Sequence, residues 1–306
     1  MTGRLSQGVN CAGQRVVVLE AQTPGWGASG RNGGQVNPGL KEDPDTIEER
    51  FGADMGARMI ALSGGAGQFV FDLIARLGIA CDARQTGCVQ PFHNAASEQV
   101  VRRRVAQWTR RGASLRLLER DTTVGLLGTA TYLGAMIDYR GGKLHPLNYA
   151  LGLADAALAA GAAVHGNSRV VSHQVQGDRH VPTTARGRVV ADKVLVCTNG
   201  YTDATIPPLR RTLVPIRSIQ VAAEILPPEL NARILPHGHS ASDARRLLLY
   251  FRKDAAGQFI MGGRGNYGET ATRRQMQVLR DASVALPRVA WHRLAPCMGR
   301  FRGDDP

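Results

Sequence analysis

Cysteine is scarce in this chain of 306 residues, and the spacing of its cysteines excludes the usual cysteine chemistry. None of them forms the C-x-x-C spacing of a zinc or redox site. The eight histidines contain no H-x-x-x-H pair, which is the helical metal motif. We therefore predict reduced, mostly buried thiols and no metal site. The five cysteines are Cys11, Cys81, Cys88, Cys197 and Cys297.

Long apolar runs are also absent. No stretch approaches the roughly 20 unbroken apolar residues of a membrane-spanning helix. Residues 1–15 lack the basic start and the apolar centre of a secretion signal. We therefore predict a cytoplasmic protein with no membrane partner. Its apolar content of 43% is normal for a packed core, and its length suits one large domain or two ordinary ones.

Lysine is rare among the basic residues. Only four of the 38 are lysines, which leaves 34 arginines, and the formal net charge is +13. Such a charge raises nucleic acid as a partner. The densest arginines, however, lie on a predicted helix at 97–111 that has apolar residues on its other face, which favours a solvated helix face. Because no motif combines aromatic and basic residues, we predict no nucleic-acid partner.

The sequence does contain a nucleotide-binding pattern at 15–35. The β-branched run Val16–Val18 leads to Glu20, and a loop with five glycines follows. A short buried strand that ends in a carboxylate before a glycine loop is how α/β proteins hold the ribose and phosphates of a nucleotide. An ordinary charge at the end of a strand is the alternative interpretation of Glu20, and spacing alone does not decide between the two.

The loop from Gly27 to Gln35 favours the nucleotide interpretation. Its glycines let backbone amides approach a pyrophosphate, and Ser29, Arg31 and Asn32 supply a hydroxyl, a cation and an amide. No nucleophile is evident, because Ser29 lies in G-A-S-G rather than in a nucleophile elbow. A flavin carries its own electron chemistry, so a redox cofactor would explain that absence.

Two helices are predicted after the glycine loop. Apolar residues recur every four positions over 47–59, and Asp45 or Thr46 is placed to cap that helix. A second amphipathic helix, 69–77, ends at a glycine. The glycines within 65–67 follow no strand, so we interpret them as a flexible junction between helices rather than as a phosphate motif.

The predicted order of strands and helices changes after residue 82. Short strands predicted at 88–92 and 132–139 flank the basic helix at 97–111, which indicates an inserted layer or domain. Alternation of strand and helix returns with a helix that begins at Pro146. An apolar strand at 193–198 then runs into Asn-Gly-Tyr-Thr. Small polar groups after such a strand point to the carboxyl edge of a sheet, where the ligands of α/β proteins bind.

Antiparallel sheet is predicted towards the end of the chain. A long strand at 212–225 and a hairpin at 247–262 precede a last helix at 270–286. Tyr250 and Arg252 occupy alternate positions on one strand and therefore share a face. We select them as candidates for substrate contact. Ordinary sheet residues remain an equally open interpretation of both.

Five motifs in this order carry a family resemblance: V-V-V-L-E-A with G-A-S-G-R-N-G-G-Q, I-A-C-D, G-G-K-L-H-P, V-L-V-C-T-N-G-Y-T, and Y-F-R with G-G-R. Together they resemble the FAD-dependent amine oxidases of the D-amino-acid oxidase superfamily, and within it the gamma-glutamylputrescine oxidases. The resemblance covers roughly residues 10–285. It implies an α/β fold in which an incomplete FAD-binding Rossmann-like domain is interleaved with an α+β substrate domain carrying a mixed, largely antiparallel sheet.

The resemblance and the changes of rhythm together suggest domain boundaries. We place the FAD-binding domain at 1–82 and 141–206, the substrate domain at 83–140 and 207–290, and a divergent tail at 291–306.

Residue roles are also implied by the resemblance. Glu20 would hold the adenosine ribose, and Val170 would meet the adenine through its backbone. Thr198 and Asn199 would close the site. The residues implied to line the pyrophosphate and the flavin are Ala28, Ser29, Arg31, Asn32, Gly33, Gly34 and Gln35.

The reaction implied by the resemblance is oxidation of a small-molecule amine, such as gamma-glutamylputrescine or an amino acid. A hydride passes to FAD, the product is an imine, and oxygen reoxidises the flavin. No catalytic base is identifiable, and the oligomeric state stays open. Only the trailing end of G-x-G-x-x-G is matched, near Met1–Gly3, and the tail departs from the family, so we expect truncation at both ends. A truncated, inactive remnant that binds FAD weakly or not at all is the alternative.

Overall fold

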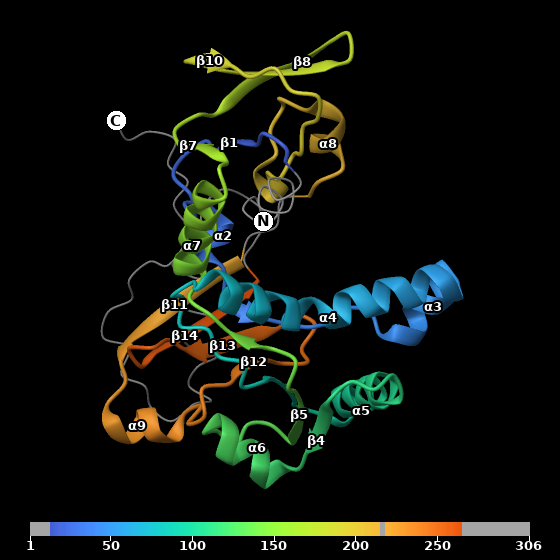
Figure 1. The fold of residues 1–306 in the computed structure, drawn as a ribbon. Helices are drawn as coiled ribbons and strands as arrows, with labels where there is room; N and C mark the ends of the chain where they lie inside the picture. The colour runs from blue at the N-terminus through green and yellow to red at the C-terminus, as the bar shows by residue number, and fades with distance from the viewer. Residues whose placement is uncertain (1–12, 215–217, 265–306) are drawn as a thin grey trace. The chain divides into compact units, whose positions relative to one another are not determined.

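The structure, a computed structural model, describes residues 13–214 and 218–264 (Figure 1). The chain divides into two compact units. Unit 1 comprises 1–32 and 146–216, and unit 2 comprises 33–145 and 217–306. Residues 33–82, which are predicted to belong to the FAD-binding domain, therefore lie in unit 2. The division of the chain by function stays a prediction.

Unit 1 combines a short parallel pair of strands with an antiparallel sheet. Strand β1 pairs in parallel with β7, with Val17 opposite Ala163. Strands β10, β9 and β8 form a separate sheet in that order. The elements are β1 Val17–Leu19, α2 Ala28–Arg31, α7 Pro146–Ala159, β7 Ala163–His165, β8 Val170–Gln176, β9 Arg179–Thr184, β10 Gly187–Arg188, the 3-10 helix η1 Asn199–Tyr201 and α8 Pro207–Arg211.

Two predictions for unit 1 are wrong. Residues 193–198 form no strand, and Leu195 and Val196 are 63% and 40% exposed. A strand needs a neighbour for its backbone hydrogen bonds, and none of the described strands pairs with this segment. On α7, the helical spacing of Leu147, Leu151, Ala154 and Leu158 predicts a core-facing apolar stripe, but Leu151 and Leu158 are 41% and 51% exposed, whereas Leu153 is buried.

Unit 2 is built on a seven-stranded sheet in the order β11-β14-β13-β12-β3-β5-β4. Only β12 and β3 pair in parallel, so the predicted mixed, largely antiparallel sheet is confirmed. Helices α5 and α6 lie beside the β4–β5 edge (Figure 1). The strands of this sheet are β3 Cys88–Phe92, β4 Leu115–Leu118, β5 Gly134–Asp138, β11 Ser218–Ile225, β12 Ser240–Ser242, β13 Leu249–Lys253 and β14 Gln258–Arg264.

The other elements of unit 2 are five helices and a second, two-stranded sheet in the described part of the chain. Strand β2 pairs antiparallel with β6, with Gln35 opposite Lys143. The elements are β2 Gln35–Val36, α3 Pro44–Phe51, α4 Ala53–Leu77, α5 Ala95–Arg110, α6 Arg120–Leu127, β6 Gly142–Lys143 and α9 Pro228–Arg233. The predicted strand at 88–92 and the hairpin at 247–262 are confirmed. The predicted strand at 212–225 is too long, because α8 precedes it and β11 begins at Ser218. The predicted helix at 270–286 lies outside the described residues.

The core of unit 2 lies on this sheet. Its largest cluster of buried side chains includes Phe251, Phe259, Ile234 and Leu235. The rings of Phe251 and Phe259 have centroids 5.8 Å apart. Large aromatic side chains that are buried this completely dominate the stability of a core.

The helical prediction for 45–77 needs two corrections. The first helix begins at Pro44 with Asp43 at its N-cap, so neither Asp45 nor Thr46 is the cap. Proline suits the first turn of a helix. It is separated from α4 by Gly52. The glycines within 65–67 lie inside α4 rather than at a junction. A Cβ at Gly64 would come within 2.9 Å of the Trp108 ring, so glycine lets α4 pack closely there.

Some arginines in and directly after α5 form ion pairs with acidic side chains. The prediction of a solvated helix face at 97–111 is therefore only partly correct. Arg104 forms an ion pair with Asp43, with 2.6 Å between Nε and Oδ1. The guanidinium of Arg111 lies 2.6 Å from a carboxylate oxygen of Glu48. Both arginine side chains are only 20% exposed. These arginines therefore connect α5 to the acidic residues at α3.

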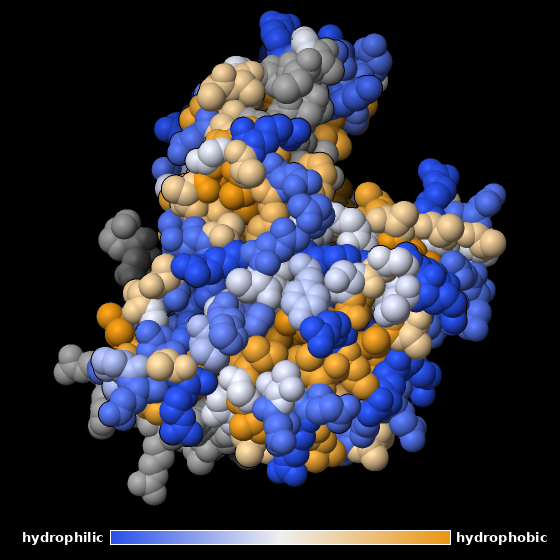
Figure 2. Space-filling model, turned by 60° about the horizontal axis from the view of Figure 1, so that its bottom comes forward, coloured by the Kyte–Doolittle hydropathy of each residue, from blue (hydrophilic) through white to orange (hydrophobic). Residues whose placement is uncertain are grey.

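Apolar side chains also reach the surface. The space-filling view shows orange patches among blue ones on the visible face (Figure 2). Helix α4 is 25 residues long and, by length and composition alone, apolar enough to cross a membrane. One such helix is weak support for a membrane span, because core helices of soluble proteins pass the same test.

Candidate functional site

The Gly33-Gly34 turn packs tightly within unit 2. A Cβ at Gly33 would come within 2.8 Å of the Tyr250 ring, and one at Gly34 within 2.3 Å of the Leu144 carbonyl oxygen. Gly34 also has φ +65°, a conformation that side chains with a Cβ adopt at a cost. The backbone here requires glycine at both positions.

Tyr250 and Arg252, the two candidates for substrate contact, both meet this turn. The Arg252 Nε donates a hydrogen bond to the Gly33 carbonyl at 2.6 Å. The Tyr250 hydroxyl lies 2.6 Å from the Ser218 hydroxyl. Burial raises the pKa of Tyr250, so its phenol stays protonated at neutral pH. The structure thus brings the candidate substrate residues to the candidate cofactor turn, although their roles stay predictions.

Gln35 fixes the same turn to the large sheet. Its side-chain amide donates to the Ala241 carbonyl of β12 at 2.7 Å, while its backbone belongs to β2. The Gly34 carbonyl accepts the Leu144 amide at 2.8 Å. These bonds hold the turn between β6 and the sheet.

Glu20 is held in unit 1 at the end of β1. Its backbone amide donates to the His165 carbonyl at 2.9 Å, and its carbonyl accepts the Ser168 amide at 2.8 Å. Its carboxylate accepts the Gln22 amide at 3.0 Å. The carboxylate is therefore fixed just beyond a parallel strand, which is where nucleotide folds hold a ribose.

The glycine loop and the 3-10 helix η1 meet through aromatic side chains. A Cβ at Gly27 would lie 3.1 Å from the Tyr201 ring. The rings of Trp26 and Tyr201 have centroids 6.4 Å apart. Neither aromatic residue was selected from the sequence. The available signal was the position of Trp26 between two glycines of the loop, Gly25 and Gly27.

Arg31 and Asn32 are engaged inside unit 1. The Arg31 guanidinium lies over the Trp26 ring, 4.7 Å from its centroid. The Asn32 amide donates to the carbonyls of Ala28 and Ser29 at 3.0 Å and 2.9 Å. Asn32 therefore closes helix α2, whereas the side chain of Ser29 is exposed.

The three remaining candidates also lie in unit 1. Val170 begins β8, and its carbonyl accepts a hydrogen bond from the Thr205 hydroxyl at 3.4 Å. The Thr198 hydroxyl lies 2.7 Å from the Thr202 hydroxyl. Asn199 has φ +47° and is exposed. Asparagine tolerates this left-handed conformation, which accounts for the residue type locally.

Metal and thiol sites are not indicated within the described ranges. No group of three or more His, Cys, Asp or Glu residues there could hold a metal ion. Cys81, Cys88 and Cys197 are free thiols. Burial raises the pKa of Cys88 to about 11, so this thiol is not a nucleophile at neutral pH.

The family model for FAD dependent oxidoreductases matches residues 5–299. This chain belongs to that family. Among curated proteins, it is 34% identical to gamma-glutamylputrescine oxidoreductase of Escherichia coli (strain K12) over 84% of the chain. It is 31% identical to the probable oxidoreductase OrdL of Rhizobium meliloti (strain 1021), also over 84% of the chain. The chain spans 60% of the length of each of these relatives.

Solved structures of other proteins share the fold. Glycine oxidase from Geobacillus kaustophilus superposes with a TM-score of 0.71 at 16% identity, covering 93% of this chain and 74% of that one. L-proline dehydrogenase from P. horikoshii gives a TM-score of 0.71 at 16% identity, covering 93% and 73%. The predicted α/β family fold with its mixed sheet is therefore confirmed.

Proposed function

We propose that this protein oxidises a small amine or amino acid with bound FAD and passes the electrons to oxygen. The observation that carries the proposal is the family match over residues 5–299. The family uses FAD, which supports a flavin here, and its members act on small molecules. Because the chain spans 60% of its curated relatives, the activity of this chain itself is part of the proposal.

The residues in unit 1 fit the adenosine end of FAD. The Glu20 carboxylate, fixed by the Gln22 amide, has acceptor capacity left for ribose hydroxyls. The exposed Ser29 hydroxyl and the exposed Asn199 amide can donate to phosphate or flavin oxygens. Arg31, stacked on Trp26, supplies a fixed positive charge near the loop.

Bound FAD would supply the hydride acceptor for amine oxidation. The chain's own residues would bind and orient the substrate. Tyr250, which stays protonated because burial raises its pKa, serves as a hydrogen-bond donor rather than as a base. Arg252 supplies a permanent positive charge beside the Gly33-Gly34 turn, suited to a substrate carboxylate. A substrate that arrives as the free amine needs no protein base.

The relative from Escherichia coli supports gamma-glutamylputrescine as the first substrate to test, and the fold relatives support amino acids as the second class. The absence of a nucleic-acid partner and the cytoplasmic location stay predictions.

Purified protein should show flavin absorbance, or gain it on adding FAD, and release peroxide with an amine from this panel. Glu20→Gln should weaken FAD binding by about 10- to 100-fold, because hydrogen bonds to a charged group contribute about 1.5–3 kcal/mol. Glu224→Gln, at an exposed position of β11, is the matched control and should bind FAD like the wild type. Protein that stays colourless with excess FAD would instead support the inactive remnant. Flavin-loaded protein that releases no peroxide would support FAD binding and contradict the oxidase activity.

A further inference from the structure

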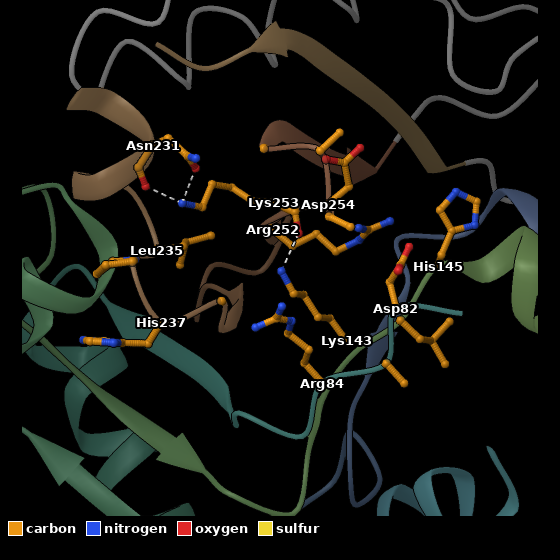
Figure 3. A pocket seen from close by; sticks show the side chains of 17 residues that line it. Asp82, Arg84, Lys143, His145, Asn231, Leu235, His237, Arg252, Lys253 and Asp254 are labelled. Carbon is orange, nitrogen blue, oxygen red and sulfur yellow. Dashed lines mark hydrogen bonds between the residues drawn. The ribbon is translucent and has the colours of Figure 1, made fainter. Parts of the chain in front are cut away.

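A cavity of about 500 Å³ lies in unit 2. Its lining includes Arg252, the candidate substrate contact, and Leu144, whose backbone amide donates to the Gly34 carbonyl. Its walls come from the segment after α4, from β6, from the loop before β12 and from the β13–β14 hairpin (Figure 3). Cavities of this volume suit a small organic ligand. All of its lining residues belong to one compact unit.

Four cationic side chains line this cavity. Lys143 and Lys253 are each 7% exposed and Arg252 is 5% exposed, whereas Arg84 is exposed. Figure 3 shows Arg84 and Lys143 extending side by side in the direction of Arg252 and Lys253. Buried cations are costly unless a negative charge or several acceptors lie beside them.

The protein itself offsets this charge only in part. The Lys143 ammonium donates to the Lys253 carbonyl at 2.6 Å, and the Lys253 ammonium donates to the Asn231 side chain at 2.7 Å. Neutral carbonyls satisfy the donors but do not neutralise the charge. In the described part of the chain, no carboxylate forms an ion pair with Arg84, Lys143 or Lys253.

Two carboxylates line the same cavity, and they leave the balance positive. Asp82 is exposed at the rim. Asp254 accepts the backbone amide of Gln258 at 2.8 Å, which commits one of its oxygens to the hairpin turn. Burial, together with the neighbouring Arg252 and Arg84, lowers the pKa of Lys143 to about 8. Among the described lining residues, cationic side chains therefore outnumber carboxylates.

We propose that this cavity binds a small organic polycarboxylate. The cations come from separate walls rather than from one point, which favours a ligand with several anionic groups over a single compact ion. The volume also exceeds what one tetrahedral anion would fill. The site shares Arg252 with the proposed substrate contact, but its argument rests on no flavin contact.

Calorimetric titration tests the site with citrate, glutarate and acetate at pH 7.5 and constant ionic strength. We expect one site per chain, with affinity falling from citrate to glutarate to acetate as carboxylates are lost. Inorganic phosphate is the comparison ligand and should bind more weakly than citrate. Absence of saturable citrate binding, or phosphate binding as tight as that of citrate, overturns the proposal. The readout needs no flavin, so it is separate from the oxidase test.

Arg84→Gln is the informative variant, because Arg84 is exposed and the substitution leaves the core intact. This substitution should weaken citrate binding at least fivefold. Arg116→Gln is the matched control, since Arg116 is an exposed arginine on β4, the edge strand of the same sheet. It should bind citrate like the wild type. Equal affinity in all three proteins, or an equal loss in both variants, contradicts the site.

Discussion

Unit 2 places its core on one seven-stranded sheet, whereas the described part of unit 1 has sheets of two and three strands. The two large apolar clusters of the described chain both lie in unit 2. Among the described residues of unit 1, few large apolar side chains are buried, and many are at the surface. The exposed ones are Val17, Leu147, Leu151, Leu158, Val171, Val175, Val190, Leu195, Val196, Tyr201 and Val214.

The two units differ in how many faces of their sheets must be covered by other parts of the chain. An antiparallel sheet is stable with one face covered, so the helices and loops of unit 2 are enough. Parallel strands are normally buried on both faces, and β1 with β7 form a pair whose residues are all exposed or half-buried. We therefore expect the stability of unit 2 to come from its core, and that of unit 1 to depend little on single apolar side chains.

The largest expected effect is at the centre of the unit 2 core. Phe259 is fully buried and packs on Phe251. Phe259→Ala should lower the free energy of unfolding by about 3–5 kcal/mol, the usual cost of truncating a buried phenylalanine. Urea denaturation followed by circular dichroism measures it. A loss below about 1 kcal/mol would show that this core is loosely packed and would remove the contrast between the units.

The Gly33-Gly34 turn should give the next largest effect. At Gly34, alanine meets both a positive φ and the Leu144 carbonyl at 2.3 Å. Gly34→Ala should cost about 2–4 kcal/mol, the sum of backbone strain and a forced shift. Gly78→Ala is the matched control, because Gly78 has φ +63° but nothing within 4 Å of a Cβ. It should cost about 1 kcal/mol. Equal losses would mean that strain alone matters at the turn.

Much of unit 2 could be predicted from the sequence. The strand at 88–92 contains the β-formers Val89 and Phe92, and the hairpin at 247–262 has the turn residues Asp254 and Gly257. The strand prediction failed at 193–198. An apolar run indicates that a segment favours burial, but it does not indicate whether a neighbouring strand is present. Pairing with a neighbour is a property of the whole sheet and leaves no signal in the run itself.

The candidate site could be predicted in part. The glycine motif and the period of two at Tyr250 and Arg252 identified residues that the structure brings to one turn. The partners of Arg31 and Asn32 could not be predicted, because an arginine can stack on a ring as readily as bind a phosphate. The cationic cavity was also missed. Its residues are far apart in sequence, and only the fold assembles them.

A pH dependence is expected from the charge buried in unit 2. Lys143 has a pKa of about 8 when folded, against an ordinary 10.5, because of burial and the neighbouring cations. Between these values the unfolded chain binds the extra proton, so stability rises with pH. From pH 8 to 10, the free energy of unfolding of the wild type should rise by on the order of 1–2 kcal/mol relative to that of Lys143→Met, since one pKa unit corresponds to about 1.4 kcal/mol.

The comparison of chemical unfolding at the two pH values cancels the other groups that titrate there, because both proteins contain them. The charged or titratable groups that act on or sense Lys143 are Arg84, Arg252, Lys253, Asp254 and His239. A difference between the two proteins that stays constant from pH 8 to 10 would contradict the lowered pKa. Citrate in the cavity should reduce the dependence, because an anion stabilises the charged lysine.

The smallest effect is expected at Leu195 in unit 1. This side chain is 63% exposed, so Leu195→Ser should change the free energy of unfolding by less than about 0.5 kcal/mol. The apolar run around it nevertheless predicts a buried strand. A loss above about 1.5 kcal/mol, the range for a buried leucine, would mean that this segment is covered in solution. Unit 1 would then bury apolar surface as unit 2 does. The two units would differ only in which segments cover their strands.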